Sequence, residues 1–140
     1  MEIKGLEIGD YVIQKHSNLI LKVSAIMPPY VQCEGENGQF HEDTIEPIPL
    51  SVEILESNGF KLVGDHTSHW QICGNGYDDI QISGVPDPKH HVSLILNAHK
   101  DSTTGTGYGF YRMIYDMPIR YVHELQHIMR ICRIGKEIKL

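Results

Sequence analysis

The run Glu46-Pro47-Ile48-Pro49-Leu50 strongly limits how this chain can fold. Each proline lacks the backbone N–H that a sheet needs, and each biases the residue before it towards an extended conformation. Two prolines at alternate positions therefore exclude the interior of a regular sheet. We predict a boundary here, between an N-terminal unit of residues 1–47 and a second unit of residues 48–140.

The first fifty residues predict short strands, because residues 6–13 and 19–27 are rich in β-forming side chains. Asn37-Gly38 favours a tight hairpin turn, so residues 39–41 are expected to return antiparallel to residues 30–34. The expected result is a small curled antiparallel sheet. An SH3-like barrel is the nearest common architecture, since five short strands can close on one core.

The second unit is predicted to be α+β, with a mostly antiparallel sheet and two helices. Ser51 is a favourable N-cap for a short helix, and Asn58-Gly59 is a favourable end for it. Pro118 fits the first turn of a later helix, which Gly135 ends. The predicted elements are a helix over about 51–58, strands within 60–115, a helix over about 119–133 and a terminal strand over 137–140.

Charge is unevenly distributed along the chain. Residues 1–111 hold six Lys or Arg against fifteen Asp or Glu, and residues 112–140 hold six against three. The acidic body argues against nucleic acid as the main partner, because clustered cations supply most of the affinity for phosphate backbones. The basic C-terminal part needs no ligand to explain it, since cations near a helix C-terminus are favoured by the helix dipole.

The compartment is predicted from what the chain lacks. No apolar run is long enough to cross a bilayer, and the first residues lack the pattern of a secretory signal. Cys33, Cys73 and Cys132 are far apart and form no Cys-x-x-Cys pair, which argues against a disulfide framework or a thiolate zinc site. We expect a cytoplasmic protein with reduced thiols and no membrane partner.

His123-Glu124-x-x-His127 has the spacing of a zinc peptidase motif, in which the two histidines bind the metal and the glutamate activates water. The extended form of the motif would need glycine and a third histidine where Arg130 and Arg133 stand. A third ligand from earlier in the chain stays open. The alternative function is therefore a zinc-dependent hydrolase with His123 and His127 as ligands and Glu124 as base.

At 100° per residue, the predicted last helix gathers its apolar side chains on one face, and the two histidines of the motif lie nearly opposite. Apolar residues beside a polar stripe often mark a contact. The predicted partner surface consists of His123, His127, Arg130, Ile131 and Ile134.

Two further features have polar compositions typical of loops. Histidines are concentrated in residues 65–69 and at His90-His91, which we place in turns between strands. We expect these histidines to bind metal ions only adventitiously. The loop from Gly105 to Gly109 resembles a phosphate-binding loop in composition, but it lacks the lysine and the following helix of that motif. Small-molecule or nucleotide binding at this loop is a second alternative function.

Three motifs, an opening one at residues 6–12, a middle one at 45–50 with a helix end at 58–60, and a closing one at 121–127, carry a resemblance along nearly the whole chain. In order and spacing they resemble small proteins of Bacteroides-type bacteria and their prophages and mobile elements, a group without an assigned activity. The resemblance implies no catalytic residue and no cofactor. We therefore expect a non-enzymatic phage or mobile-element accessory protein that binds a host or phage protein through its sheet faces or its terminal helix, with homo-oligomer formation left open.

Overall fold

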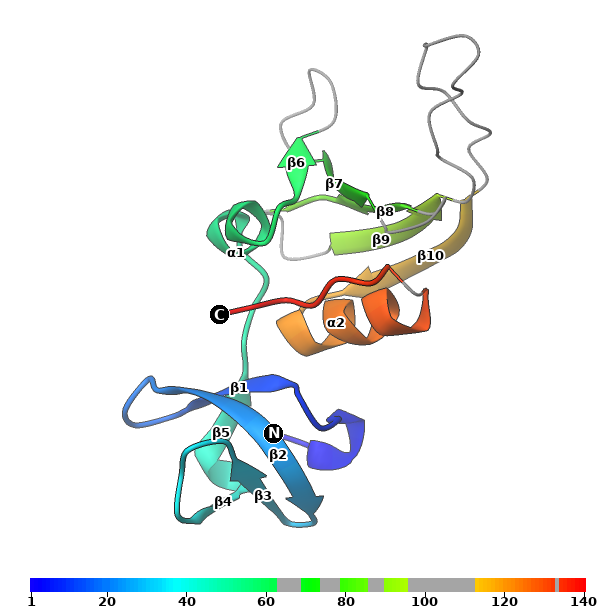
Figure 1. The fold of residues 1–140 in the computed structure, drawn as a ribbon. Coiled ribbons are helices and arrows are strands. Elements are labelled where there is room, and N and C mark those ends of the chain that lie inside the picture. Colours follow the sequence, from blue (N-terminus) through cyan, green and yellow to red (C-terminus); the bar gives the residue numbers. More distant parts are fainter. Residues whose placement is uncertain (63–68, 74–78, 86–89, 96–112, 133) are drawn as a thin grey trace, which may run out of the picture. The chain divides into compact units, whose positions relative to one another are not determined.

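An antiparallel sheet is the framework of each part of the protein. The structure is a computed structural model that describes residues 1–62, 69–73, 79–85, 90–95, 113–132 and 134–140 (Figure 1). The chain forms two compact units: unit 1 is Met1–Pro49 with Tyr121–His123 and Leu140, and unit 2 is Leu50–Arg120 with Glu124–Lys139. The prediction of an α+β fold with mostly antiparallel strands and two helices is confirmed.

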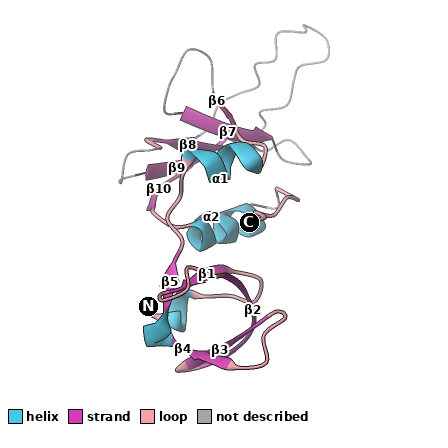
Figure 2. Cartoon of the chain, turned by 90° about the vertical axis from the view of Figure 1, so that its left-hand side faces the viewer, coloured by secondary structure: helices cyan, strands magenta, loops and turns pink. Residues whose placement is uncertain are grey.

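Unit 1 contains a five-stranded sheet in the order β4-β3-β2-β1-β5, in which all neighbours are antiparallel (Figure 2). Its strands are β1 (Tyr11–Gln14), β2 (Ile20–Met27), β3 (Tyr30–Cys33), β4 (Gln39–His41) and β5 (Ile45–Pro47), with 3-10 helices η1 (Ile3–Gly5) and η2 (Glu42–Thr44). The expected antiparallel return of residues 39–41 is confirmed, since Gln32 pairs with Gln39. The positive φ of this turn is at Gly35 (75°) and not at Asn37-Gly38, so the tight turn predicted there is wrong. Pro47 ends the edge strand β5, where a missing donor is tolerated.

The long strand β2 pairs with two other strands. Its first half pairs with β1 and its second half with β3, and the register shifts between Val23 and Ala25. An irregularity of this kind bends a strand and increases its twist. The core of unit 1 gathers side chains from all its strands and from η1; it consists of Ile3, Leu6, Val12, Leu21, Val23, Val31, Cys33 and Ile45, with Met1, Ile26 and Phe40 packed against it.

Within unit 1, the chain segment after β5 lies beside the start of the last helix. Pro49 and Tyr121 form an isolated antiparallel bridge. The backbone N–H of Val122 donates to the carbonyl of Ile48 at 2.9 Å. Residues far apart in the sequence are thus held next to each other by backbone contacts.

Unit 2 contains a second antiparallel sheet, in the order β10-β9-β8-β7-β6. Its elements are α1 (Val52–Ser57), β6 (Lys61–Leu62), β7 (His69–Cys73), β8 (Asp79–Ser83), β9 (His90–Ile95), β10 (Met113–Ile119) and most of α2 (Val122–Ile131). Both helices lie on the same side of this sheet (Figures 1 and 2). No helix in the described ranges is long and apolar enough to cross a membrane.

Alternation of side chains explains the buried face of this sheet. Trp70 and Ile72 of β7 are buried, and they pair across the ladder with the buried Ile82 and Ile80 of β8. Gln71, between the two buried residues, is half-buried. This pattern is typical of a strand with one face on a core.

The helix α1 begins and ends as its local sequence dictates. The hydroxyl of Ser51 accepts a hydrogen bond from the Ile54 N–H at 3.2 Å, which satisfies one of the free donors of the first turn. Leu55 is fully buried. Gly59, with a φ of 85°, ends the helix in the left-handed conformation that glycine adopts at low cost.

The end of the chain differs from the sequence expectation in two places. Pro118 lies in β10, whereas we expected it in the first turn of a helix; β10 is an edge strand, where proline is tolerated. Residues 137–140 form no strand. Instead, the backbone of Lys139 makes its hydrogen bonds with the side chain of Asn58, which competes with strand pairing.

Candidate functional site

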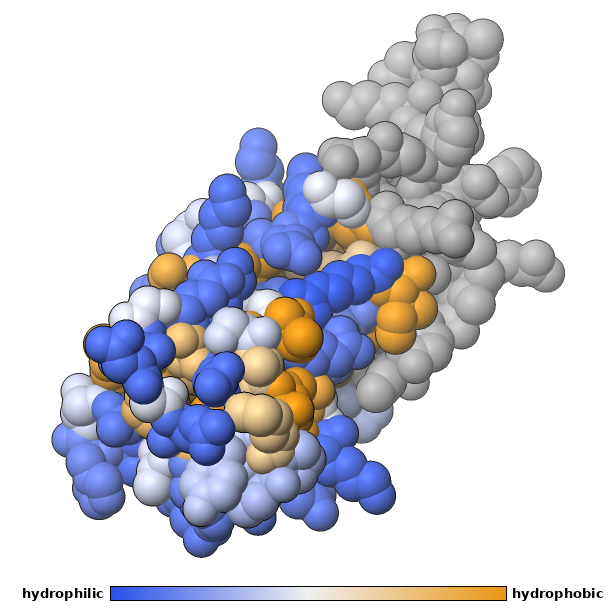
Figure 3. All heavy atoms as spheres, turned by 60° about the horizontal axis from the view of Figure 1, so that its bottom comes forward, coloured by the Kyte–Doolittle hydropathy of each residue, from blue (hydrophilic) through white to orange (hydrophobic). Residues whose placement is uncertain are grey.

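The turn between β2 and β3 exposes four consecutive residues, which we call the hairpin tip: Met27, Pro28, Pro29 and Tyr30. Met27 and Tyr30 pair across the strands, and they are 42% and 41% exposed. Figure 3 brings the bottom of Figure 1 forward, and on this face hydrophobic side chains (orange) reach the surface between hydrophilic ones (blue). Aromatic and methionine side chains are the types enriched at protein interfaces.

Contacts with β4 and η2 hold the hairpin tip in place. The N–H of Glu42 donates to the carbonyl of Pro29 at 2.9 Å. The rings of Tyr30 and His41 meet edge to face, with centroids 5.2 Å apart and an interplanar angle of 80°, a favourable geometry for aromatic pairs. Because the tip is already ordered, a partner that binds it loses less conformational entropy.

The orientation of His41 is itself fixed by η2. Its Nδ1 accepts a hydrogen bond from the Asp43 N–H at 3.2 Å, and its carbonyl accepts one from the Thr44 hydroxyl at 2.7 Å. The Asp43 carboxylate lies 3.4 Å from the same Nδ1.

Unit 1 is strongly acidic around this surface. Residues 1–49 hold three Lys or Arg against eight Asp or Glu, a net charge of −5. Glu42 and Asp43 directly follow His41, and the Asp43 side chain is 82% exposed. The hairpin tip is therefore an apolar surface with carboxylates at its border.

A second group of exposed apolar residues lies at the other end of β2. Leu19 and Ile20 are 46% and 47% exposed, and Ile20 pairs with Ile13 of β1. Their exposure is similar to that of Met27 and Tyr30, but the group contains no aromatic ring. It therefore provides a matched control for the tip.

The thiol of Cys33 is not a nucleophile in this fold. Burial, with a smaller contribution from the negative charge of Glu36, raises the pKa of the Cys33 thiol to about 11. Because the thiolate is the reactive form, a thiol with so high a pKa is unreactive near neutral pH. Cys33 belongs to the core of unit 1.

In the His123-Glu124-x-x-His127 motif, Glu124 contacts the backbone at the start of α2. Its Oε2 accepts a hydrogen bond from the Arg120 N–H at 2.7 Å, within unit 2. Glu124 is the third residue of α2, and its side chain reaches a backbone N–H one residue before the N–H that a capping box would use. The carboxylate thus has a structural role that the motif alone does not reveal.

The two histidines of this motif differ in exposure. His123 is only 8% exposed, and its ring stacks on that of Tyr121 with centroids 5.8 Å apart. His127 is half-buried. The expectation that both histidines lie on a solvated face is wrong for His123, because its ring packs against the residue that precedes the helix.

The partner surface predicted on the last helix is only partly exposed. Ile131 is 78% exposed, and Arg130 is half-buried with its Nε 3.3 Å from Oε1 of Glu137. Ile134 is fully buried, contrary to the prediction. Its N–H donates to the carbonyl of Met129 at 3.0 Å, so the chain turns back after the helix and takes Ile134 out of the helical periodicity.

The sequence pattern predicts the contact surface on the last helix and does not single out the hairpin tip. The sequence does contain an indication of the tip, because two prolines between Met27 and Tyr30 predict a turn. A turn that joins two strands presents its side chains to solvent. What the sequence did not show is that η2 returns to this turn and orders it.

The structure describes the other predicted sites only in part. His69 begins β7 and His90 begins β9, whereas we expected turns. Residues 65–68 and the loop at 105–109 lie outside the described residues. Within the ranges that the structure describes, no group of three or more His, Cys, Asp or Glu is placed to hold a metal ion. Comparison of the chain with protein-family models, with curated proteins and with solved structures gives no match.

Proposed function

We propose that this protein is a non-enzymatic accessory protein of a phage or mobile element and that it acts by binding a host or phage protein through the hairpin tip. The observation that carries the proposal is an exposed apolar turn, Met27–Tyr30, which is ordered by its contacts with Glu42 and His41. The resemblance of three sequence motifs to prophage-associated proteins supports the origin.

The composition of the tip and of its border defines the partner. Tyr30 supplies contact area at low conformational cost, and the flexible Met27 adapts its shape, which together suit an apolar depression on another protein. Glu42 and Asp43 favour Lys or Arg at the rim of that depression, where complementary charge steers association. A duplex nucleic acid would instead be repelled by the net charge of unit 1.

We also propose that unit 1 is an SH3-like barrel. Its support is that β2 bends to serve both β1 and β3, and that the edge strands contribute Phe40 and Ile45 to one core. The expected result is a set of nuclear Overhauser contacts between the Phe40 ring and core methyl groups of β1 or β5. An absence of such contacts would show an open sheet and contradict the barrel.

The binding proposal is tested by charge substitution at the two ends of β2. Tyr30→Glu introduces a carboxylate into the tip, and Leu19→Glu introduces one at a site of similar exposure. Both baits, with the wild type, are used for quantitative capture from host lysate after circular dichroism has verified folding. We expect a protein that the wild type and Leu19→Glu retain and that Tyr30→Glu loses. Equal capture by all three would contradict the role of the tip.

Once the partner has been captured, the two carboxylates at the border of the hairpin tip, Glu42 and Asp43, can be tested separately. Replacing Glu42 and Asp43 by Gln and Asn is expected to lower the association rate about threefold to tenfold at low salt and to weaken its salt dependence. An association rate that is unchanged and still salt-dependent would show that these carboxylates do not face the partner. Sedimentation of the wild type alone tests whether the partner is a second copy of the chain.

A further inference from the structure

The last residues of unit 2 border two adjoining hollows, which we call the C-terminal cleft. One, of about 410 Å³, is lined by Met129, Arg130, Gly135, Lys136 and Glu137. The other, of about 530 Å³, is lined by Ser57, Asn58, Gly135, Lys136, Glu137 and Lys139. Each volume falls within the range of about 300–1,000 Å³ that small-molecule sites occupy.

The cleft is formed by the chain segment 134–139, whose exposed middle part is anchored at both ends. Ile134 and Ile138 are buried, whereas the three residues between them are exposed. At one end the backbone of Ile134 bonds to Met129, and at the other the backbone of Lys139 bonds to the Asn58 side chain. The exposed residues are therefore held in a fixed place next to the ends of both helices.

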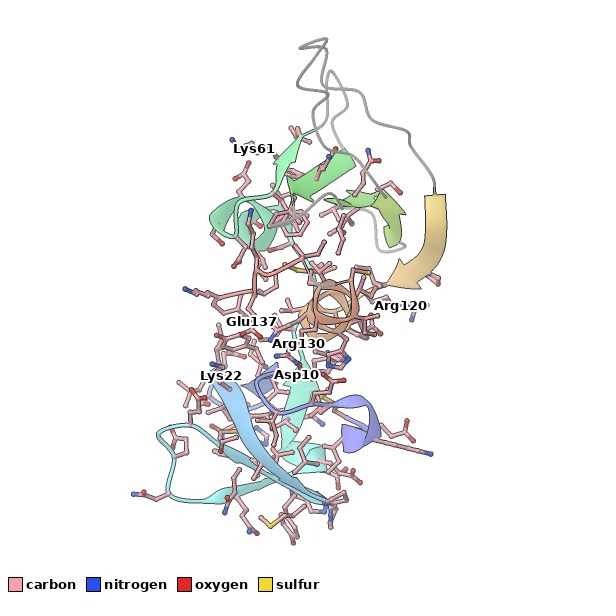
Figure 4. All side chains as sticks on the ribbon, turned by 45° about the vertical axis from the view of Figure 1, so that its right-hand side comes forward. Asp10, Lys22, Lys61, Arg120, Arg130 and Glu137 are labelled. Atoms are coloured by element: carbon pink, nitrogen blue, oxygen red, sulfur yellow. The ribbon has the colours of Figure 1, made fainter. Side chains whose placement is uncertain are left out.

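Positive charge dominates the lining. It contains Arg130, Lys136 and Lys139 against a single carboxylate, that of Glu137, which pairs with Arg130 at 3.3 Å (Figure 4). The C-termini of α1 and α2 add only partial negative charges, of about half a unit each. The net charge of the cleft is thus positive, although unit 1 and the whole chain are acidic.

Hydrogen bonds to a helix C-terminus do not account for the two lysines, although a cation near such an end can donate them to the last carbonyl groups. Among the residues that the structure describes, the ammonium groups of Lys136 and Lys139 make neither a hydrogen bond nor an ion pair. Each ammonium group is a point charge with three donors, so both are available to an anion.

We propose that the C-terminal cleft binds a small-molecule anion, with its phosphate or carboxylate group between Lys136 and Lys139. This site lies in unit 2 and is independent of the hairpin tip. The Arg130 side chain completes it when the anion replaces Glu137 as its partner. Such an exchange is inexpensive, because the Glu137 side chain is 57% exposed and a solvated ion pair contributes little to stability.

The test is a titration of the labelled full chain, followed by amide NMR, with inorganic phosphate in one arm and citrate in the other. We expect saturable shifts confined to residues 130–139 and complete by about 50 mM ligand, at which a site with a Kd of about 5 mM is mostly filled. The arm that saturates at lower concentration distinguishes phosphate from carboxylate ligands. Shifts that do not saturate in either arm would overturn the proposal.

The matched control is an exposed lysine of the same unit that does not line the cleft, Lys61 of β6 (Figure 4). Lys136→Gln with Lys139→Gln is expected to weaken binding about tenfold or more, whereas Lys61→Gln leaves it unchanged. Equal weakening by both variants would show a general charge effect and overturn the site. All the substituted side chains are exposed, so the variants should fold; thermal unfolding verifies this.

Discussion

The side-chain amide of Asn58 hydrogen bonds to both backbone groups of Lys139. Its Oδ1 accepts from the Lys139 N–H at 2.7 Å, and its Nδ2 donates to the Lys139 carbonyl at 3.0 Å. The same Nδ2 lies 2.8 Å from the carbonyl of Ile54, in the last turn of α1. One residue thus ends a helix and fixes the C-terminal segment, in place of the strand that the sequence predicts.

Removal of this amide should loosen the C-terminal segment. Asn58→Ala is expected to lower the free energy of unfolding by about 1–2 kcal/mol, since it removes hydrogen bonds from a half-buried group. Urea unfolding measures the change, and hydrogen exchange should show lost protection at Lys139. Glu56→Ala, at an exposed position of the same helix, is the control and should change stability much less. Equal effects would contradict the role of Asn58.

Substitutions of Glu124 test whether this residue has a structural role or a catalytic one. Because its carboxylate accepts a hydrogen bond from the Arg120 N–H, Glu124→Gln retains an acceptor and should keep nearly full stability. Glu124→Ala should lose about 0.5–1 kcal/mol. A zinc hydrolase would instead contain metal and would lose peptidase activity in Glu124→Gln. Metal analysis of the purified protein and a peptidase assay of both variants distinguish the two functions.

Glycine substitutions test the backbone conformation at the end of α1. A Cβ at Gly59 meets no atom within 4 Å, yet its φ of 85° strains any other residue. Gly59→Ala should therefore cost about 1 kcal/mol. Gly5→Ala provides the comparison, since Gly5 has the same open space without the positive φ, and this variant should be neutral or slightly stabilising. A neutral Gly59→Ala would contradict the left-handed helix end.

Truncation of the core of unit 1 should be far more costly than truncation of its surface. Ile45 is fully buried in β5, and Ile45→Ala should lower the free energy of unfolding by about 2–5 kcal/mol because it leaves a cavity. Leu19→Ala, which removes an exposed side chain of similar size, should change it by less than about 0.5 kcal/mol. Chemical denaturation of both variants measures the difference.

The pH dependence of stability should reveal the buried thiol of Cys33. Its pKa is raised to about 11, chiefly by burial, so the folded state holds the thiol proton more tightly than the unfolded state does. This contribution to stability is fully present below the pKa of an ordinary thiol and is lost as the pH rises towards about 11. Cys33→Ala should show a smaller decline than the wild type over that interval. Parallel declines would contradict the raised pKa.

Local chemistry accounts for the parts of the fold that the sequence predicts well. The turn composition of residues 34–38 predicts that the chain reverses between β3 and β4, although the left-handed residue is Gly35, with a φ of 75°, and not Asn37-Gly38. Ser51 specifies the start of α1 through one hydrogen bond. The α+β class follows from the same local signals, which do not depend on distant residues. The conformation of these elements is determined within a window of a few residues.

Long-range contacts decide the parts that the sequence does not predict. Pro118 predicts the start of a helix, but its pairing with His91 places it in a strand. Helical periodicity predicts that Ile134 is exposed, but a chain reversal buries it. The order of the hairpin tip likewise depends on η2. Each outcome is set by a neighbour that the local pattern does not include.

The bridge between Pro49 and Tyr121 brings the two ends of the intervening segment to adjacent points of unit 1. A segment whose ends are already adjacent can lengthen, shorten or be exchanged without displacing the strands that carry it. Changes in length at turns within residues 50–120 are therefore compatible with the bridge, while residues on both sides of the bridge, which also share unit 2, must be inherited together. Selection on one side of the bridge constrains the other.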